Sequence, residues 1–478
     1  MNNLEDKKRA IVIGAGPAGL TAADSLVKSK KFQVTILEQD NVVGGLSKTT
    51  EYKNCKFDIG PHHFLTHDEK VEKWWLDLMK DEVGKNNEFI KLQRFTRIYY
   101  KKHFFYYPLQ AYNVITGLNF FTCCACVLSY VKSSLFPIKK VKSFQDWVSN
   151  KFGHKLFSIF FKTYTEKVWG IDCNKISSDW ASQRIKGFSL SKAIFYAFFG
   201  KLFKKNAPRT LADKFYYPLQ GAGTLWNKVA NNLISSKNCE LNLKQEVISL
   251  EYENFQIKSV ITPKEKFSGD YFLSTMPLRE LILSMTPVVP QKVLFAAQNL
   301  KYRALVTINL IVDKKNICPD HWLYIHEKEV IMGRIGNMNN FSLSMVDCPD
   351  HTALSLEYFT FITDDFYQKR DKDLIKIAKL EMEKLGLVKA NQVLDGMVLK
   401  IEQAYPVYDE NYKYNLDIVL NYLSKFKNLE LMGRNGLHRY NNMDLAMITA
   451  FESVERVLDK AHGERIDFEI INPGNVRV

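Results

Sequence analysis

The sequence predicts an α/β fold built on a Rossmann-like dinucleotide-binding unit, with an inserted helical domain and a second, mixed β-sheet. Three observations support this prediction. A βαβ pattern with a glycine-rich turn opens the chain, a block rich in Phe, Tyr and Lys at helical spacing follows, and alternating strand patterns fill much of the second half. At 478 residues the chain exceeds the size at which single cores stop growing, so two or three domains are expected.

The βαβ pattern lies at the start of the chain. Residues 9–13 form an apolar strand, residues 20–26 continue at helical spacing, and residues 34–37 resume as a strand. The segment Gly14-Ala15-Gly16-Pro17-Ala18-Gly19 joins the first strand to the helix. A strand, a glycine-rich turn and a helix in this order are typical of a dinucleotide site.

Each glycine of this turn has a physical role. Gly14 permits the tight turn, Gly16 lets a pyrophosphate approach the backbone, and Gly19 lets the helix pack closely on the strand. The phosphates then meet the positive end of the helix. Glu38 ends the second strand, at the distance expected for a carboxylate that holds a ribose hydroxyl. We therefore expect these four residues to bind a dinucleotide.

Later segments give the coarse organisation of the rest of the chain. Strands are predicted at 247–252, 255–262, 271–275 and 429–432, a mixed sheet at 305–361 and a helix at 371–385. From Phe104 to about Lys205 the pattern is helical. This block is expected to be an inserted domain.

The charge and the cysteines limit the function classes. A net charge of +14 indicates an anionic partner: a phosphate-bearing small molecule, a lipid surface or a nucleic acid. Because no zinc finger, basic zipper or RNP-like motif accompanies the charge, no nucleic-acid partner is expected. The eight cysteines lack zinc-ligand spacing, so we expect reduced thiols and no metal. The first ten residues do not have the pattern of a secretory signal, which favours a cytoplasmic location.

Two segments are candidates for peripheral membrane contact. Residues 113–131 are nearly uncharged and are interpreted as a buried or lipid-touching helix rather than a membrane span. Residues 185–205 interleave phenylalanines with lysines at helical spacing, which suits a membrane interface. The alternative is a helix packed on its own domain with lysines outward. A location at the inner face of a membrane therefore stays open.

The segment Asn41-Val42-Val43-Gly44-Gly45-Leu46-Ser47 resembles the flavoprotein superfamily of amine oxidases, protoporphyrinogen oxidases and UDP-galactopyranose mutases. In those families a Gly-Gly turn follows the flavin pyrophosphate. The resemblance implies FAD as the cofactor, held by Gly44, Gly45 and Leu46 together with the first turn. Val247 is expected to contact it as well. An ordinary loop is the alternative for the Gly-Gly pair alone.

The segment Gly60-Pro61-His62-His63-Phe64-Leu65-Thr66 is similar to one that places a histidine beside the flavin ring in the mutases. The resemblance makes His62 and His63 catalytic candidates. Those enzymes often carry another histidine where this chain has Leu65. The alternative is that both are ordinary core or surface histidines.

The helical block holds Tyr164-Thr165-Glu166-Lys167-Val168-Trp169-Gly170, which resembles a mutase segment whose tryptophan lies near the substrate nucleotide. Arg184 follows at nearly the mutase spacing, with one extra residue. The resemblance implies that Trp169 binds substrate and that Arg184 reaches the diphosphate and flavin. A guanidinium suits a diphosphate because it binds phosphate oxygens in a fork. The alternative is a core tryptophan and a surface ion pair.

The C-terminal part carries the most specific similarity. Tyr405-Pro406-Val407 resembles a mutase Tyr-Pro-Ile, and Gly433-Arg434-Asn435-Gly436-Leu437-His438-Arg439-Tyr440 matches Gly-Arg-x-Gly-x-x-x-Tyr. The resemblance implies that Arg434 meets the flavin or its pyrophosphate, that Tyr405 and Tyr440 touch the substrate diphosphate, and that Met443 opens a helix capping the flavin ring.

Two further positions are expected to bind substrate. Asn442 stands where many bacterial mutases have an aspartate, which puts that contact in doubt. Arg334, in Gly333-Arg334-Ile335-Gly336-Asn337, is the candidate for a second diphosphate arginine.

The resemblance implies the following domain plan. Residues 1–75, 211–290 and 425–478 form a discontinuous FAD-binding domain, residues 76–210 a mainly helical domain facing substrate and membrane, and residues 291–424 a mixed-sheet substrate domain. The FAD-binding domain is discontinuous because its two motifs lie at opposite ends of the chain.

Three functions remain open from the sequence. The motifs favour a mutase that isomerises a nucleotide-diphosphate sugar between pyranose and furanose forms for surface polysaccharide, with FAD needed in the reduced state and NAD(P)H as reductant. The second is an oxidoreductase of the protoporphyrinogen or amine oxidase type, acting on an apolar or lipid-linked substrate. The third, a scaffolding flavoprotein, fits poorly with intact motifs. A homodimer is left open.

Overall fold

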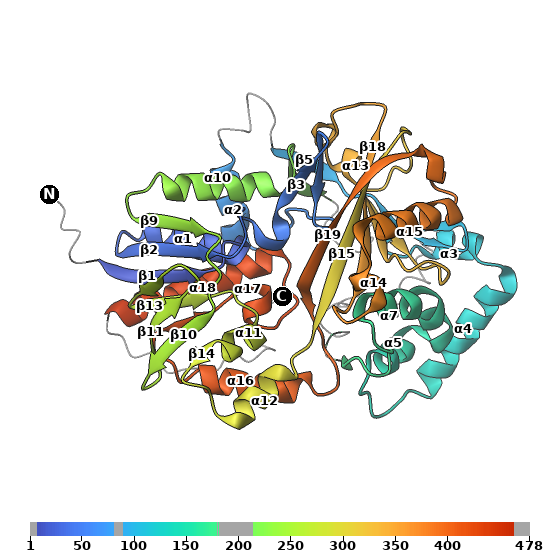
Figure 1. Ribbon diagram of the computed structural model, residues 1–478. Helices are drawn as coiled ribbons and strands as arrows, with labels where there is room; N and C mark the ends of the chain where they lie inside the picture. The colour runs from blue at the N-terminus through green and yellow to red at the C-terminus, as the bar shows by residue number, and fades with distance from the viewer. Residues whose placement is uncertain (1–6, 81–88, 179, 181–213, 463–478) are drawn as a thin grey trace.

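The computed structural model describes residues 7–80, 89–178, 180 and 214–462. Figure 1 shows two lobes side by side, one around the sheet that contains β1 and the other around the long strands β15 and β19. The helices of residues 111–169 lie at the far end of the second lobe (Figure 1).

The first lobe is built on a five-stranded parallel sheet. Its order is β20 (Leu429–Leu431), β13 (Tyr271–Ser274), β1 (Lys8–Ile13), β2 (Phe32–Glu38) and β9 (Cys239–Leu243). Successive residues of β1 enter different cores, Ala10 and Val12 on one face and Ile11 and Ile13 on the other. A central parallel strand must bury both faces, which explains why β1 is apolar at consecutive positions.

Helices and a smaller sheet cover the two faces. The first face packs against α1 (Pro17–Lys28), α10 (Gly223–Ile234) and α18 (Met443–His462), with α2 (Glu69–Leu78) beside them. The second packs against α11 (Leu278–Leu283), α12 (Gln291–Gln298), α16 (Tyr412–Leu423) and a four-stranded sheet. That sheet has the order β12 (Lys266–Ser268), β11 (Gln256–Ile261), β10 (Ser249–Glu253) and β14 (Met285–Thr286).

The second lobe contains a seven-stranded mixed sheet. Its order is β19 (Val393–Pro406), β15 (Tyr302–Val312), β18 (Thr352–Thr360), β17 (Arg334–Asn337), β16 (Trp322–Ile325), β6 (Thr96–Tyr100) and β7 (His103–Tyr106). Every residue of β15 and β18 is buried. α15 (Asp371–Lys384) packs on one face through an apolar core, with α14 (Asp365–Gln368) near its start. The other face carries Glu357, completely buried, toward the first lobe.

The helices at the end of this lobe follow one another closely. They are α3 (Ala111–Gly117), α4 (Phe120–Leu135), α5 (Phe144–Phe152), α6 (His154–Phe157) and α7 (Thr163–Trp169). A π-helical turn at Ser158–Lys162 joins α6 to α7 into one helical run. Ser143 and Asp146 form a capping box that starts α5.

Short elements complete the fold. They are the hairpin of β3 (Thr49–Tyr52) and β4 (Cys55–Asp58), the pair β5 (Phe89–Gln93) and β8 (Lys214–Pro218), α13 (Met338–Phe341), α17 (Gly433–Gly436), and 3₁₀ turns at Gly45–Ser47, Leu343–Met345 and Ala390–Gln392. Asp58 at the end of β4 accepts hydrogen bonds from the hydroxyls of Thr49 and Tyr217. This carboxyl thereby ties the hairpin to β8.

Two expectations need correction. The range 76–210 is not mainly helical at its start, because β5, β6 and β7 occupy residues 89–106 and β6 pairs in parallel with β16. That pairing joins segments more than 200 residues apart, so no local pattern reveals it. Residues 113–131 are two helices rather than one, since Asn119 accepts the Thr122 N–H and starts α4. Among the described residues, no helix is long and apolar enough to cross a membrane.

Candidate active site

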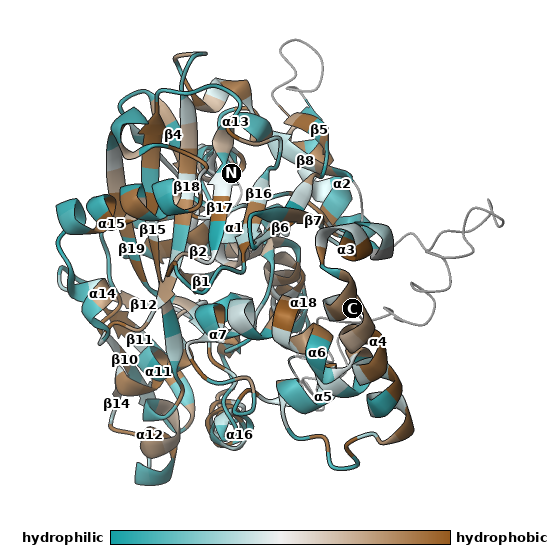
Figure 2. Cartoon of the chain, turned by 90° about the vertical axis from the view of Figure 1, so that its right-hand side faces the viewer, coloured by the Kyte–Doolittle hydropathy of each residue, from teal (hydrophilic) through white to brown (hydrophobic). Residues whose placement is uncertain are grey.

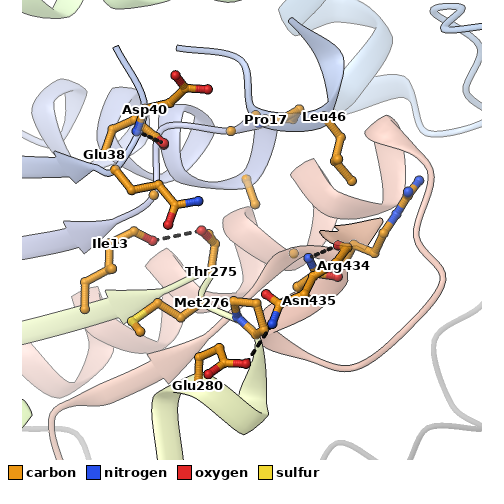
Figure 3. A pocket seen from close by; sticks show the side chains of 18 of the residues that line it. Ile13, Pro17, Glu38, Asp40, Leu46, Thr275, Met276, Glu280, Arg434 and Asn435 are labelled. Atoms are coloured by element: carbon orange, nitrogen blue, oxygen red, sulfur yellow. Dashed lines mark hydrogen bonds between the residues drawn. The ribbon is translucent and has the colours of Figure 1, made fainter. Parts of the chain in front are cut away.

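A cavity of about 930 Å³ opens at the carboxyl ends of β1, β2 and β13. This is the edge at which open parallel sheets bind ligands. Figure 3 shows Glu38 and Asp40 on one side of the cavity and Arg434 on another, with Thr275 and Met276 between them. Its size lies at the upper end of small-molecule pockets, so it can take an extended dinucleotide.

The first turn has the close approaches that its glycines predict. Gly14 has a φ of +99°, and a Cβ there would lie 2.0 Å from the Thr275 hydroxyl oxygen. A Cβ on Gly19 would lie 1.8 Å from the Gly14 carbonyl oxygen. Gly16 and Gly14 line the cavity, whereas Gly19 packs the helix on the strand and does not. The structure therefore divides the three glycines between ligand approach and helix packing.

Gly16 and Gly19 should respond differently to alanine. Gly16→Ala has room, since its Cβ meets only the Gly45 Cα at 3.8 Å, so the apoprotein should keep its stability while FAD affinity falls. Gly19→Ala forces the helix off the strand and should cost about 2 kcal/mol of apoprotein stability. Thermal unfolding of both apoproteins, with FAD titration of each, measures the two effects. Equal unfolding temperatures for the two variants would contradict this division.

Glu38 is buried at the end of β2 and lines the cavity. Its carboxylate accepts the Ala15 N–H at 2.7 Å and the Asp40 N–H at 2.9 Å. Burial raises the pKa of Glu38, and these two N–H groups oppose the shift. The two bonds hold the carboxylate in place, and each oxygen keeps a lone pair for a ribose hydroxyl.

The Gly-Gly turn lies against the first turn. The Gly44 N–H donates to the Ala15 carbonyl at 2.8 Å, and Gly44 and Gly45 both have positive φ. A Cβ on Gly45 would stand 3.2 Å from the Gly16 Cα. Gly45 and Leu46 line the cavity, whereas Gly44 only sets the turn. Two glycine backbones thus meet at the point where a pyrophosphate must pass.

The C-terminal motif closes the cavity from the opposite side. Gly433, Arg434, Asn442 and Met443 line it, and α18 begins at Met443 with its N-terminus at the wall. Arg434 donates from Nε to the Asn441 carbonyl at 2.9 Å and from Nη1 to the Ala404 carbonyl at 3.1 Å. No carboxylate pairs with Arg434 in the part of the chain that the structure describes. Its charge therefore remains available to an anion.

Val247 also lines the cavity, on the segment between β9 and β10. Several lining residues were not predicted from the sequence. Thr275 follows β13 and donates from Oγ1 to the Ile13 carbonyl at 2.8 Å, and Gln403 of β19 donates to Glu280 at 2.7 Å. The signal for Thr275 was available, because a hydroxyl residue at the end of a strand beside β1 must face the same edge.

The two candidate histidines lie in different surroundings. His62 lines the cavity, its Nε2 lies 2.9 Å from the Ile59 carbonyl, and burial and Arg434 lower its pKa to about 3. His63 does not line the cavity and stacks on Trp322 with ring centroids 5.4 Å apart. Burial lowers the pKa of His63 to about 4. The prediction of a catalytic His63 is therefore not supported by its position, while a neutral His62 is well placed beside a ligand.

Four predicted substrate residues come together in one cluster beside Arg434. Tyr405 and Tyr440 stack with centroids 5.4 Å apart, and the Arg434 guanidinium lies 5.2 Å and 5.1 Å from their rings. Arg334 donates to the Tyr405 hydroxyl at 3.0 Å, and Trp169 meets Tyr440 edge to face at 6.2 Å. Residues from β17, α7, β19 and the loop before α18 thus form one Arg–Tyr cluster.

Arg334 and Trp169 differ from the simplest expectation. Arg334 forms an ion pair with Glu357. Burial raises the pKa of Glu357, and the charge of Arg334 opposes this shift. The Glu357 partner was not predicted from the sequence, and its signal was absent because the two residues meet across β17 and β18. Trp169 is 1% exposed, which agrees with the core alternative. Arg184 lies outside the described residues.

Comparisons with known proteins agree with this geometry. The family model described as flavin containing amine oxidoreductase matches residues 17–397. The chain belongs to this family. Its cofactor is FAD, and the cavity fits it through the paired glycine turns, the buried Glu38 and the guanidinium of Arg434. Bound FAD supplies the reactive flavin ring.

Solved structures are similar over almost the whole chain. A reduced UDP-galactopyranose mutase has a TM-score of 0.81 at 21% identity, covering 98% of this chain and 97% of the mutase. A protein from Exiguobacterium sp. 255-15 described as a protoporphyrinogen oxidase has a TM-score of 0.70 at 14% identity, covering 94% and 98%. At these identities the likeness establishes the fold.

Among curated relatives, the similarity is confined to a short segment. The inactive all-trans-retinol 13,14-reductase of Danio rerio is 42% identical over 81 residues, which is 17% of this chain and 13% of that protein. The chain therefore matches only about an eighth of that relative's length.

Buried histidines should make this flavoenzyme sensitive to acid. Burial lowers the pKa of His326 to about 3 and of His438 to about 4, alongside His62 and His63. Unfolded histidine titrates near 6.5, so below that pH the unfolded chain takes up protons that the folded chain does not. The contribution of these neutral histidines to the free energy of unfolding is fully present above about pH 6.5. It is lost as pH drops toward 4, by up to about 1.4 kcal/mol per pH unit for each histidine.

The variant His326→Phe tests the predicted acid sensitivity. His326 stacks on Tyr164 at 5.2 Å, so a phenylalanine ring preserves the packing and removes the proton site. Between pH 6.5 and 5.5, the free energy of unfolding of this variant should fall with a slope smaller by about one proton. His103→Phe, at an exposed histidine, is the control for removing a histidine from the protein surface. An unchanged slope in His326→Phe would refute the assignment.

Proposed function

We propose that this protein is an FAD-dependent enzyme that isomerises a nucleotide-diphosphate sugar between pyranose and furanose forms, for surface polysaccharide synthesis. The observation that supports this proposal most is the Arg–Tyr cluster next to the FAD cavity. Arg434, with no carboxylate partner among the described residues, lies between the cavity and the rings of Tyr405 and Tyr440. A diphosphate needs this combination of a guanidinium and hydroxyl donors.

The protein's own groups would bind and orient the substrate rather than act as strong acids or bases. Tyr405 is buried and Tyr164 is half-buried. Burial raises the pKa of Tyr405 to about 12 and raises the pKa of Tyr164 well above its ordinary value, so both hydroxyls stay protonated and can donate. His62 is neutral at physiological pH because its pKa is lowered to about 3. A site of fixed hydrogen-bond donors suits a reaction in which a diphosphate leaves and returns.

The reduced state of FAD is part of the proposal, with NAD(P)H as reductant. The solved mutase with the same fold was studied in its reduced form. The test is to incubate the purified holoenzyme, with and without dithionite, with a panel of UDP-, GDP- and dTDP-hexopyranoses. Chromatography of the nucleotide sugars should show a furanose product with reduced enzyme only.

A binding assay distinguishes a wrong substrate class from a failure of the chemical step alone. Quenching of flavin fluorescence by UDP and by UDP-sugars should occur with the wild type and weaken at least tenfold in Tyr440→Phe. Tyr252→Phe is a matched control, because its hydroxyl contacts Tyr422 far from the cavity lining. If no nucleotide or nucleotide sugar binds in either redox state, the mutase proposal is wrong.

A second candidate is an oxidoreductase of the protoporphyrinogen or amine oxidase type, acting on an apolar or lipid-linked substrate. The favouring observation is the aromatic character of the region beyond Arg434, where Trp169, Trp180, Tyr405, Tyr408 and Tyr440 contact one another. Reduction of the bound FAD by an amine or porphyrinogen under anaerobic conditions would support it. Stoichiometric bleaching of the flavin absorbance is the readout.

A further inference from the structure

α4 presents its apolar side chains to the outside. Phe121, Leu128, Val131 and Leu135 are 83%, 70%, 46% and 68% exposed. Their spacing of seven, three and four residues places them on one face of the helix, together with exposed Cys124. A helix of a monomeric protein normally turns such a stripe toward the core.

The opposite face of α4 attaches the helix to the protein. Cys126 is buried there, and the Ser129 hydroxyl accepts the Lys155 N–H at 3.0 Å. The backbone of α4 approaches α6 so closely that a Cβ on Gly153 would lie 2.7 Å from the Tyr130 nitrogen. The orientation of α4 is therefore fixed by close packing of its small side, and the outward apolar stripe is not the result of a loosely attached helix.

The stripe is part of a larger exposed surface, which we call the α3–α4 face. Figure 2 shows α3 and α4 at the edge of the molecule, with hydrophobic colouring along α4. Besides the four residues of the stripe, the face contains Tyr112, Ile115, Phe120, Val127, Phe136, Ile138 and Val141. Single exposed apolar residues are ordinary, but a contiguous group of this kind marks an interaction site.

The segment that carries this face is strongly basic. From Phe89 to Gln145 the sequence contains nine lysines and arginines and no aspartate or glutamate. Four of these cations are exposed beside the apolar stripe, at Lys132, Lys139, Lys140 and Lys142. Phenylalanines beside lysines match the two layers of a membrane surface, with acyl chains below and anionic headgroups above.

We propose that the α3–α4 face docks on a membrane surface that contains anionic lipids, with α4 lying in the plane of the interface. The phenylalanines enter the acyl boundary while the lysines extend to the lipid phosphates. A second copy of this chain fits less well. In a symmetric dimer the lysines of the two faces would meet each other, and the nearby Asp146 already accepts the backbone N–H groups of Lys142 and Ser143.

Docking in this orientation would bring the Arg–Tyr cluster near the membrane. Cys126 of α4 belongs to the same hydrophobic core as Trp169 and Tyr405. The lobe that carries the docking face is therefore also the lobe that supplies part of the substrate region. The dinucleotide turn lies in the other lobe (Figure 1). The proposal does not depend on which of the two candidate functions is correct.

Vesicle sedimentation of the FAD-loaded enzyme tests the proposal. Vesicles of phosphatidylcholine alone are compared with vesicles that also contain phosphatidylglycerol. The wild type should bind the mixed vesicles, and added salt should weaken the binding. A double variant, Phe121→Ser with Leu128→Ser, and a triple variant, with Lys139, Lys140 and Lys142 changed to Gln, should each lower the partition coefficient by roughly tenfold or more.

The matched control removes equally exposed apolar groups from the first lobe. Phe295→Ser with Val288→Ser, at side chains 64% and 76% exposed, should bind vesicles like the wild type. FAD content and unfolding temperature establish that each variant is folded. The proposal is overturned if the wild type ignores both kinds of vesicle or if the double variant binds unchanged. It is equally overturned if the same variants abolish a dimer seen by light scattering without affecting lipid binding.

Discussion

Arg434→Ala should lower the affinity for FAD by roughly a hundredfold or more, because it removes two charge-assisted hydrogen bonds and a cation of the cavity that lacks a carboxylate partner among the described residues. Those bonds run to Asn441, just before α18, and to Ala404 on β19. Their loss frees the loop before α18, whose first residue lines the cavity. Equilibrium dialysis of FAD against the apoprotein is the measurement.

Two variants show whether the effect belongs to this guanidinium. Arg434→Lys keeps the charge but cannot reach both carbonyls in a fork, so its affinity should be intermediate. Arg456→Ala removes an arginine of α18 that contacts Glu430 and Ser453 and does not line the cavity, so it should leave FAD binding unchanged. If Arg434→Ala retains FAD as well as Arg456→Ala does, the C-terminal motif does not hold the cofactor.

Arg334→Met should destabilise the protein by about 3–5 kcal/mol, because it leaves the carboxylate of Glu357 buried without a cation. Glu357 has no exposed surface, and its Oε1 already lacks a hydrogen-bond partner among the described residues. Denaturant unfolding of the apoprotein gives the free energy. The loss should be far larger than the median effect of a surface substitution.

The paired variant distinguishes an unpaired charge from lost packing. Arg334→Met combined with Glu357→Leu should recover most of the stability, since two apolar side chains replace a buried ion pair. The difference in free energy of unfolding between the single and double variants should become smaller as pH falls. Burial raises the pKa of Glu357, and protonation of its carboxylate removes the unpaired charge. A gap that is independent of pH, or no recovery at all, would contradict this account.

Local sequence was enough to predict the FAD end of the site. Gly14, Gly16 and Glu38 lie within 25 residues of one another, and a single βαβ unit of β1, α1 and β2 brings them to the wall of the cavity. The Gly433-Arg434 motif was predicted from its resemblance to a family motif, and in the structure it directly follows β20 and precedes α18. The roles of these residues as FAD ligands stay predictions that the Gly16 and Arg434 variants test.

Other parts of the site depend on pairings that no local pattern encodes. Glu357 meets Arg334 because β17 and β18 are neighbours, and His63 leaves the cavity because Trp322 and Phe215 form an aromatic pocket for its ring. The strands β6 and β7 join the second sheet although they lie in the range 76–210, which was expected to be mainly helical. Each of these contacts joins segments far apart along the chain or sets a register across strands.

By itself, the sequence determined the α/β class and the dinucleotide turn, because φ-permissive glycines and a terminal carboxylate act within one βαβ unit. FAD as the cofactor followed from the family resemblance of the Gly-Gly and Gly-Arg segments. Only the tertiary structure decided which predicted residues share a cavity, which charge is neutralised and which side of α4 faces outward. The apolar stripe of that helix is the same in either orientation. Its exposure is set by the small residues on the other side, which pack closely on α6.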